Sequence, residues 1–478
     1  MTRRTKIVAT IGPASETPEC IAELINAGVN VFRLNLSHGD IEGHTAVANC
    51  IRQQAKKLGA QVGILADLQG PKIRIAQFEN SSVTLSEGDD FCLNLNLECD
   101  AGNQKEVGID YPELCQDVVN SDILLLDDGR IQLKVETVES SIVRCKVTIG
   151  GRLNSRKGIN KLGGGLSARA LTEKDIDDIA ALAKIQPDFV AVSFVRSEKD
   201  IRETRSRLED IAINPAIIAK IERAEVVADD NVLDKILERA DGIMVARGDL
   251  GVEVGDAELI GIQKHLIRRA RQKNRVVITA TQMMESMINS ATPTRAEVFD
   301  VANAVLDGTD AVMLSAETAV GNYPVEVVSA MSSTCLGAER HPIARTSRYR
   351  IDGEFSSAEE SIAMAAIYAA NHYSEVKCIA SLTESGRTPL LMSRLSSGLP
   401  IYALSRQPAT LGKLCLCRGV IPLYFDHSEE SEAEVQQRVI DILKIDSGFL
   451  SGDSILLTRG EIMGSPGNTN VLKIITIP

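Results

Sequence analysis

Charged side chains directly follow two short aliphatic runs in the middle of the chain. Ile217–Ala219 precedes Lys220 and Glu222, and Met244–Ala246 precedes Asp249 after a short connection. Such runs are typical of strands buried on both faces, where an unpaired carboxylate is costly. Structural ion pairs would explain one strand that ends in this way. Two in succession indicate a divalent-metal site, because Mg²⁺ takes one or two carboxylates and leaves its other positions to water and substrate oxygens.

Polar side chains also gather where other predicted strands end. They are Arg33, Asn35, Ser37 and His38 after the second strand, Asp67, Lys72 and Arg74 after the third, Gly248 after the sixth, Thr281 after the seventh and Ser315 after the eighth. Cations beside a carboxylate-bound metal suit a phosphorylated substrate, for which catalysis is mostly positioning and charge stabilisation. The residues by themselves therefore indicate phosphoryl-transfer or enolate chemistry.

Eight aliphatic runs separated by helical stretches must position these groups. The runs are Ile7–Ile11, Val29–Leu34, Gln61–Ala66, Phe189–Phe194, Ala216–Ile221, Gly242–Ala246, Arg275–Ala280 and Ala311–Leu314. This alternation predicts a (β/α)8 TIM barrel, whose chemistry lies at the C-terminal ends of its strands. A doubly wound open sheet is the alternative, but no glycine fingerprint follows the first run.

Two further domains are expected. From about residue 70 to 165, short alternating runs with turn signals such as Asp128-Gly129 predict a small inserted β-barrel. The triple glycine Gly163–Gly165 that closes it is either a hinge or an ordinary linker. The C-terminal part again alternates strands with helices and predicts an open α/β domain. The expected domains are residues 1–70 with 166–345 for the barrel, 71–165 for the insertion and 346–478 for the C-terminal domain.

Composition narrows the class of protein. Aromatic residues make up 3% of the 478 residues and Trp is absent, so the core must consist of Val, Ile, Leu and Ala, as in parallel sheets covered by helices. A net charge of −13 argues against a nucleic-acid or anionic-membrane partner. The ten Cys residues show no zinc-ligand spacing, and no run is a signal or membrane segment. We therefore expect a cytoplasmic protein with reduced thiols.

The chain resembles the pyruvate kinases over nearly its whole length. The motifs that carry the resemblance are Arg33-Leu-Asn-Leu-Ser-His-Gly39, Asp67-Leu-Gln-Gly-Pro-Lys-Ile-Arg74, Ser155-Arg-Lys-Gly-Ile-Asn160, Ala219-Lys-Ile-Glu222, Met244-Val-Ala-Arg-Gly-Asp-Leu-Gly251, Thr279-Ala-Thr-Gln-Met283 and Met313-Leu-Ser-Ala-Glu-Thr318. Each motif is weak by itself. Their order on the predicted strands, with a β insertion after the third, is highly specific.

The resemblance implies the last step of glycolysis, in which phosphoenolpyruvate gives its phosphoryl group to ADP and leaves pyruvate and ATP. By analogy, Glu222 and Asp249 would hold Mg²⁺ or Mn²⁺, and Lys220 would stabilise charge on the phosphoryl group and the enolate. The other implied roles are substrate binding by Arg33, Gly248, Asp249, Thr281 and Ser315, proton relay through water by Thr281, and nucleotide contact by Asn35, His38, Arg74 and Lys157. Since Lys157 lies on the insertion, that domain would act as a lid, with Asp127 and Asp128 near its tip.

A monovalent-cation site and an effector site are also implied. Asn35, Ser37, Asp67 and the Leu68 carbonyl match K⁺ ligands of many members. K⁺-dependent members usually have Glu where this chain has Lys72, and a tethered ammonium can supply the same charge. We therefore expect K⁺ to be possible but not required.

The C-terminal domain carries the second implied site. Thr383-Glu-Ser-Gly-Arg-Thr388 resembles the loop that binds a phosphorylated activator, with Thr383, Ser385, Gly386, Arg387 and Thr388 as contacts and Gly464–Gly467 as a facing wall. A plain helix cap is the alternative. The resemblance further implies a homotetramer.

Two other functions remain open at this point. A Mg²⁺-dependent lyase or mutase acting on an enolate could share the Glu222 and Asp249 pair, but it would not need a lid or Lys157. A non-catalytic sensor of phosphorylated metabolites would be a barrel that has lost its chemistry. Against the sensor, every motif position with an implied role keeps a chemically competent side chain.

Overall fold

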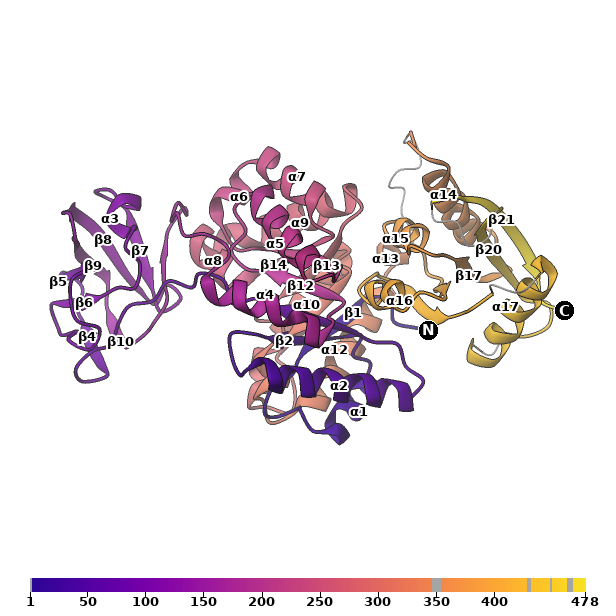
Figure 1. Ribbon diagram of the computed structural model, residues 1–478, viewed down its shortest axis with the longest axis horizontal. Helices are drawn as coiled ribbons and strands as arrows, with labels where there is room; N and C mark the ends of the chain where they lie inside the picture. The colour runs from indigo at the N-terminus through magenta and orange to yellow at the C-terminus, as the bar shows by residue number, and fades with distance from the viewer. Residues whose placement is uncertain (1, 346–353, 428–430, 448, 462–466) are drawn as a thin grey trace.

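The computed structural model describes residues 2–345, 354–427, 431–447, 449–461 and 467–478. Three units lie in a row (Figure 1). An all-β unit lies at one end, a barrel lies in the middle, and an α/β unit with the C-terminus lies at the other end. The N-terminus lies where the barrel meets the C-terminal unit.

Eight parallel strands close the central barrel in the order β1-β16-β15-β14-β13-β12-β3-β2. Their bounds are β1 Lys6–Thr10, β2 Val31–Asn35, β3 Gly63–Asp67, β12 Phe189–Val192, β13 Ala216–Ile221, β14 Gly242–Ala246, β15 Val276–Ala280 and β16 Ala311–Leu314. The expected TIM barrel, with a β insertion after the third strand, is therefore confirmed. The third strand runs to Asp67 because that residue pairs in register with Asn35 and Ala191.

Helices surround the barrel. They are α1 Pro18–Ala27, α2 Ile41–Lys57, α4 Glu173–Ile185, α5 Glu198–Asp210, α6 Ala224–Ala228, α7 Asp230–Arg239, α8 Arg247–Val254, α9 Asp256–Gln272, α10 Arg295–Asp307, α11 Ala316–Ala319, α12 Pro324–Glu339 and α13 Pro342–Arg345, with the 3₁₀ helix η1 Glu285–Ile288. The caps follow the sequence: Thr17 accepts a hydrogen bond at the start of α1, and Thr172 with Asp175 forms a capping box on α4. Among the described residues, no helix is long and apolar enough to cross a membrane.

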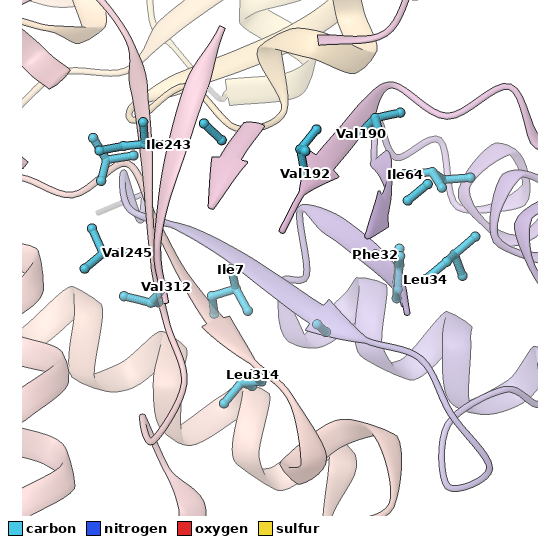
Figure 2. Packing of buried hydrophobic residues seen from close by; sticks show 14 of the residues in the cluster. Ile7, Phe32, Leu34, Ile64, Val190, Val192, Ile243, Val245, Val312 and Leu314 are labelled. Carbon is cyan, nitrogen blue, oxygen red and sulfur yellow. The ribbon is translucent and has the colours of Figure 1, made fainter. Parts of the chain in front are cut away.

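Strand alternation separates two apolar layers in the barrel. Outward side chains pack under the helices, including Ile7, Phe32, Ile64 and Val190 (Figure 2). Inward side chains belong to a second cluster, made up of Val8, Val31, Leu65, Phe189, Ala191, Ile218, Met244, Ile278 and Met313 together with side chains of the C-terminal domain. Because successive side chains alternate, the residue two after an inward one also faces the barrel interior. The interior is therefore apolar near the C-terminal domain and polar at the other end.

The inserted unit, β4 to β11, is called the lid below. Its elements are β4 Ser82–Leu85, β5 Asp90–Asn94, β6 Glu106–Gly108, α3 Leu114–Asp117, β7 Ile123–Leu126, β8 Ile131–Val138, β9 Ile142–Ile149, β10 Gly151–Asn154 and β11 Ile159–Lys161. They form a six-stranded sheet and a separate β10-β4 ladder around one apolar core. The Asp128-Gly129 turn lies between β7 and β8, as its composition predicts.

The C-terminal unit is a five-stranded sheet in the order β19-β18-β17-β20-β21, in which β21 is antiparallel. Its elements are α14 Ala358–His372, β17 Val376–Leu382, α15 Arg387–Ser393, β18 Ile401–Ser405, α16 Pro408–Leu414, β19 Val420–Tyr424, α17 Glu432–Ser447, β20 Ser454–Gly460 and β21 Thr469–Thr476. This is the open α/β domain expected from the sequence. It lies at the N-terminal end of the barrel strands and leaves their C-terminal ends facing the lid (Figure 1).

Candidate active site

A buried carboxylate, Asp67, lies between two cations at the C-terminal end of the barrel. Arg33 Nε donates to Asp67 Oδ2 at 2.6 Å, and Lys220 Nζ lies 3.3 Å from Asp67 Oδ1. Lys220 Nζ also lies 3.2 Å from Glu222 Oε1. Val31, Leu65 and Ile218 point into the barrel. Arg33, Asp67 and Lys220 each lie two residues further along the same strands, so their side chains point inward as well.

Charge states in this cluster follow from its contacts. Burial opposes ionisation of Asp67, but Lys220 and Arg33 outweigh it and lower the pKa of this carboxyl. Burial likewise lowers the pKa of the Lys220 ammonium, while Asp67 and Glu222 outweigh it and raise the pKa. At neutral pH the centre therefore holds an ammonium and a carboxylate, with a guanidinium beside them.

Glu222 and Asp249 form the carboxylate pair expected to bind metal. Burial raises the pKa of Glu222, Lys220 counteracts this effect, and the nearby Asp249 adds to it. Glu222 Oε2 accepts a hydrogen bond from the Phe194 amide at 2.6 Å, and Lys72 Nζ lies 3.2 Å from Asp249 Oδ1. No group of three metal-ligating side chains occurs in the part of the chain that the structure describes. Two carboxylates fit a Mg²⁺ ion that takes its other ligands from water and substrate.

The strand-seven rim is held in an uncommon backbone conformation. Thr281 has φ 69° and Gln282 has φ 57°, and a β-branched residue rarely adopts such values. Arg247 Nη2 donates to the Thr281 carbonyl at 2.6 Å, and the Gly248 amide donates to Thr281 Oγ1 at 2.9 Å. Arg247 is itself paired with Asp300 at 2.7 Å. Arg247 thus supports the loop, and its contacts fix the Thr281 hydroxyl beside Gly248.

Ser193 completes the cluster, although it was missed in the sequence. Its hydroxyl accepts from Lys220 Nζ at 2.7 Å and donates to the Leu68 carbonyl at 2.8 Å. A hydroxyl at the end of the fourth strand was the available signal, since that strand ends on the same rim. Ser315, which was expected on this rim, directly follows β16. Its amide donates to the buried Glu317 carboxylate at 2.6 Å.

Three of the four proposed monovalent-cation ligands already have partners. The Asn35 side chain accepts from the Ser37 amide at 3.3 Å, Asp67 is held by Arg33 and Lys220, and the Leu68 carbonyl accepts from Ser193. Lys72 lies against Asp249 and not against this set. A fixed positive charge is thus present beside the candidate metal ligands.

The four residues expected to contact nucleotide divide between two places. Asn35 and His38 line a largely apolar cleft of about 510 Å³ beside the barrel, together with Ile11, Pro13 and Val47. Arg74 and Lys157 lie on the lid side, where Arg74 Nη1 donates to the Arg156 carbonyl and Lys157 Nζ lies 2.7 Å from Asp127 Oδ1.

A second cleft, also about 510 Å³, joins the lid tip to the barrel. Asp128 and Gly129 line it from the lid, and Gly248, Asp249 and Gln282 line it from the barrel. The lid turn and Asp249, one of the two candidate metal ligands, therefore face the same space.

The candidate effector loop lies in the C-terminal unit, on the far side of the barrel from the lid (Figure 1). The Gly386 amide donates to Thr383 Oγ1 at 2.9 Å, and Thr388 Oγ1 lies 2.7 Å from Thr469 Oγ1. The Arg387 side chain is paired with Glu359 at 3.0 Å. Of the expected facing wall, residues 464–466 lie outside the described residues.

Comparison with known proteins decides the family. Residues 2–328 match the pyruvate kinase barrel domain, and residues 360–475 match the pyruvate kinase alpha/beta domain. The chain belongs to the pyruvate kinase family. It is 55% identical to pyruvate kinase II of Salmonella typhimurium and 56% identical to a pyruvate kinase of Haemophilus influenzae, in each case over 99% of both chains.

A solved pyruvate kinase of Cryptosporidium parvum has the same overall structure. It superimposes with a TM-score of 0.91 at 34% identity and covers 100% of this chain and 96% of its own. Pyruvate kinases are phosphotransferases, so the resemblance seen in the motifs is confirmed at the level of family and enzyme class.

Proposed function

We propose that this protein transfers the phosphoryl group of phosphoenolpyruvate to ADP, giving pyruvate and ATP. The observation that carries the proposal is the position of Lys220 Nζ. It lies at the polar end of the barrel between Asp67 and Glu222, within 3.3 Å of both carboxylates. A charged ammonium held there can stabilise negative charge that develops on the phosphoryl group and on the enolate oxygen.

The substrate would lie between Arg33 and Thr281. Arg33 binds the substrate phosphate, and its guanidinium is oriented by Asp67 and by Thr10 Oγ1 at 3.0 Å. The Gly248 amide, Asp249, Thr281 and Ser315 surround the carboxylate end. The Thr281 hydroxyl, fixed by Gly248, passes a proton through water to the enolate carbon.

Glu222 and Asp249 would hold Mg²⁺, or Mn²⁺ in its place. When bound, this ion neutralises charge on phosphate oxygens during transfer. The negative charge of Asp249 raises the pKa of Glu222. A cation bound between the two carboxylates would offset this repulsion, which supports the assignment.

Nucleotide binding would use both clefts. The apolar cleft at Asn35 and His38 suits a flat base, while Arg74 and Lys157 bring positive charge from the lid. Lys157 now pairs with Asp127 and would exchange this partner for a phosphate when the lid closes.

Lys72 would make K⁺ unnecessary. Its ammonium lies 3.2 Å from Asp249, next to the space that phosphates would occupy. Three of the K⁺ ligands implied by resemblance are engaged with neighbouring groups: Asn35 with the Ser37 amide, Asp67 with Arg33 and the Leu68 carbonyl with Ser193. The fourth is Ser37.

The loop Thr383–Thr388 would bind a sugar phosphate or a nucleoside monophosphate that activates the enzyme. Thr383, Ser385, Gly386, Arg387 and Thr388 would hold the phosphate, with Arg387 leaving Glu359. Such an activator should lower the half-saturating phosphoenolpyruvate concentration, and Arg387→Ala should abolish that shift. Unchanged activation in the variant would contradict the site.

We further infer a homotetramer with three domains per chain: residues 1–70 with 166–345, residues 71–165 and residues 346–478. The last of these begins at residues 346–353, which lie outside the described part of the chain.

One coupled assay tests the proposed reaction. Purified protein with phosphoenolpyruvate, ADP and Mg²⁺ should form ATP and pyruvate in equal amounts. Consumption of phosphoenolpyruvate without ATP would instead favour a lyase or mutase. Effector binding without any turnover would favour a sensor.

A further inference from the structure

A buried carboxylate outside the candidate metal site, Glu253, joins the lid to the barrel. Glu253 lies near the end of α8, four residues after Asp249, and its side chain is completely buried. Its Oε2 accepts from the Ala224 amide at 2.8 Å. Ala224 lies two residues after Glu222. Glu253 therefore connects the segments that follow the two candidate metal ligands.

The same carboxylate reaches the lid. Asn160 Nδ2, on β11, donates to Glu253 Oε1 at 3.5 Å, and the Gly163 amide donates to the Glu253 carbonyl at 2.8 Å. A Cβ at Gly164 would lie 3.2 Å from Glu253 Oε2 and 2.3 Å from Glu225 Oε2. The chain can return from the lid this close to the barrel because the residue is glycine, with φ +77°.

Arg223 extends this junction toward the metal site. Its Nη1 lies 3.9 Å from Glu253 Oε1 and donates to the Leu166 carbonyl at 3.4 Å. Its guanidinium lies 5.2 Å from the centre of the Phe194 ring, and the Phe194 amide donates to Glu222. The Arg223 side chain is only 2% exposed, and its Nε has no hydrogen-bond partner. The long contacts can shorten if the lid moves toward the barrel.

We propose that Glu253 is a positioning residue that couples the placement of the lid to the alignment of Glu222 and Asp249. A shift of the return segment, residues 162–168, changes the contacts of Glu253 with Asn160 and Gly163. That change reaches the segments of both candidate ligands directly. The Glu253 side chain accepts from the Ala224 amide, and the Glu253 backbone is part of α8, which carries Asp249. The inference rests on the metal site proposed above, but the structural coupling itself does not require bound metal.

Charge at this junction also responds to pH near neutrality. Burial raises the pKa of Glu253 to about 7, with Arg223 acting against the shift and Glu225, on α6, adding to it. The carboxylate and its protonated form are thus both populated under ordinary assay conditions. Because burial outweighs the attraction of Arg223, ionisation of Glu253 disfavours the closed junction, which should open more readily as the pH rises through 7.

Amide hydrogen exchange of the metal-free protein tests the coupling without any turnover. Glu253→Gln keeps the shape of the side chain and an acceptor for Ala224, but removes the charge. We expect exchange at residues 162–168 to fall about tenfold at pH 8, because the neutral side chain no longer favours opening of the junction, with the barrel strands unchanged. Glu258→Gln, an exposed position on α9, is the matched control and should exchange like the wild type. Exchange rates at residues 162–168 that are the same in Glu253→Gln and the wild type would overturn the proposal. Faster exchange throughout the barrel would overturn it as well.

Mg²⁺ titration of turnover gives the second readout. Glu253→Gln should raise the half-saturating Mg²⁺ concentration and lower kcat, each about tenfold, with less than a twofold change in KM for phosphoenolpyruvate. Asn160→Ala removes only the lid contact and should shift both values in the same direction by a smaller factor. An Asn160→Ala enzyme with wild-type exchange and wild-type Mg²⁺ response would contradict the coupling. If the wild type forms no ATP at all, the proposed reaction fails, while the exchange comparison still decides the role of Glu253.

Discussion

The two ends of the barrel both bury charge, but they do so differently. At the N-terminal end of the strands, Asp310 of the barrel and Arg394 of the C-terminal domain form an ion pair with two hydrogen bonds. Each side chain is about 1% exposed. Asp310 also accepts from the Val277 and Arg418 amides, and Arg394 donates to the Arg275 carbonyl. Every oxygen of that carboxylate is thus hydrogen-bonded.

At the C-terminal end of the barrel strands, the buried charged groups are less completely hydrogen-bonded. Asp67 Oδ1 has an ion-pair neighbour in Lys220 but no hydrogen bond, and the Glu222 pKa is raised by burial and by Asp249. Lys72 and Asp249 line or border a cleft that a ligand can enter. Burial of charge therefore does not mark a site by itself. A functional site is indicated where buried charged groups are incompletely paired and a ligand can reach them.

Loss of the central ammonium should have the largest effect. Lys220→Met removes the charge that we propose to stabilise the transition state, so kcat should fall by at least about 10³-fold while the protein still folds and binds Mg²⁺. Steady-state turnover and metal binding by calorimetry are the measurements. Lys235→Met on the exposed face of α7 is the control. Turnover near the wild-type rate in Lys220→Met would remove Lys220 from the mechanism.

Breaking the pair at the other end should act on stability instead. Arg394→Met leaves Asp310 buried beside an uncharged side chain, and the free energy of unfolding should fall by about 3–5 kcal/mol. Chemical denaturation measures this value, with the exposed Arg340→Met as the control. A loss below about 1 kcal/mol, the range of surface pairs, would show that the two ends do not differ in this way.

The Glu253 carboxylate should make stability fall with rising pH. Burial raises its pKa from 4.5 to about 7, so the folded protein keeps a proton that the unfolded chain releases. Its contribution is complete below pH 4.5 and is lost as pH rises through 7. Across this window the wild type should lose on the order of 3 kcal/mol more than Glu253→Gln. Parallel stability curves for the two proteins would contradict the raised pKa.

A reversal of charge at Lys72 should give the smallest of these effects. The wild type should change less than twofold in rate when K⁺ replaces tetramethylammonium, because Lys72 already supplies a positive charge. Lys72→Glu should become activated about tenfold by K⁺. Lys72→Arg keeps the charge and should behave like the wild type. A strict K⁺ requirement in the wild type would refute the role of Lys72.

Much of the architecture was predictable because local patterns agree with the fold. Aliphatic runs separated by helical stretches predicted the eight strands, and short alternating runs with turn signals predicted the inserted β domain. The pairings within the site were not predictable. Arg33 and Asp67 had been given separate roles from the motifs, whereas the structure joins them at 2.6 Å. Ser193 was missed because a single hydroxyl after a strand has no distinctive pattern.

The sequence by itself determined which side chains share a face of each strand. Alternation along β13 puts Ile218 and Lys220 on the same face, and barrel closure makes that face the inward one. Only the tertiary structure decided their partners, because barrel closure sets which strand ends meet. Lys220 thereby reaches Asp67 from β3 and Ser193 beyond β12. Glu253 likewise meets Asn160, 93 positions earlier, through a lid whose placement no local pattern specifies.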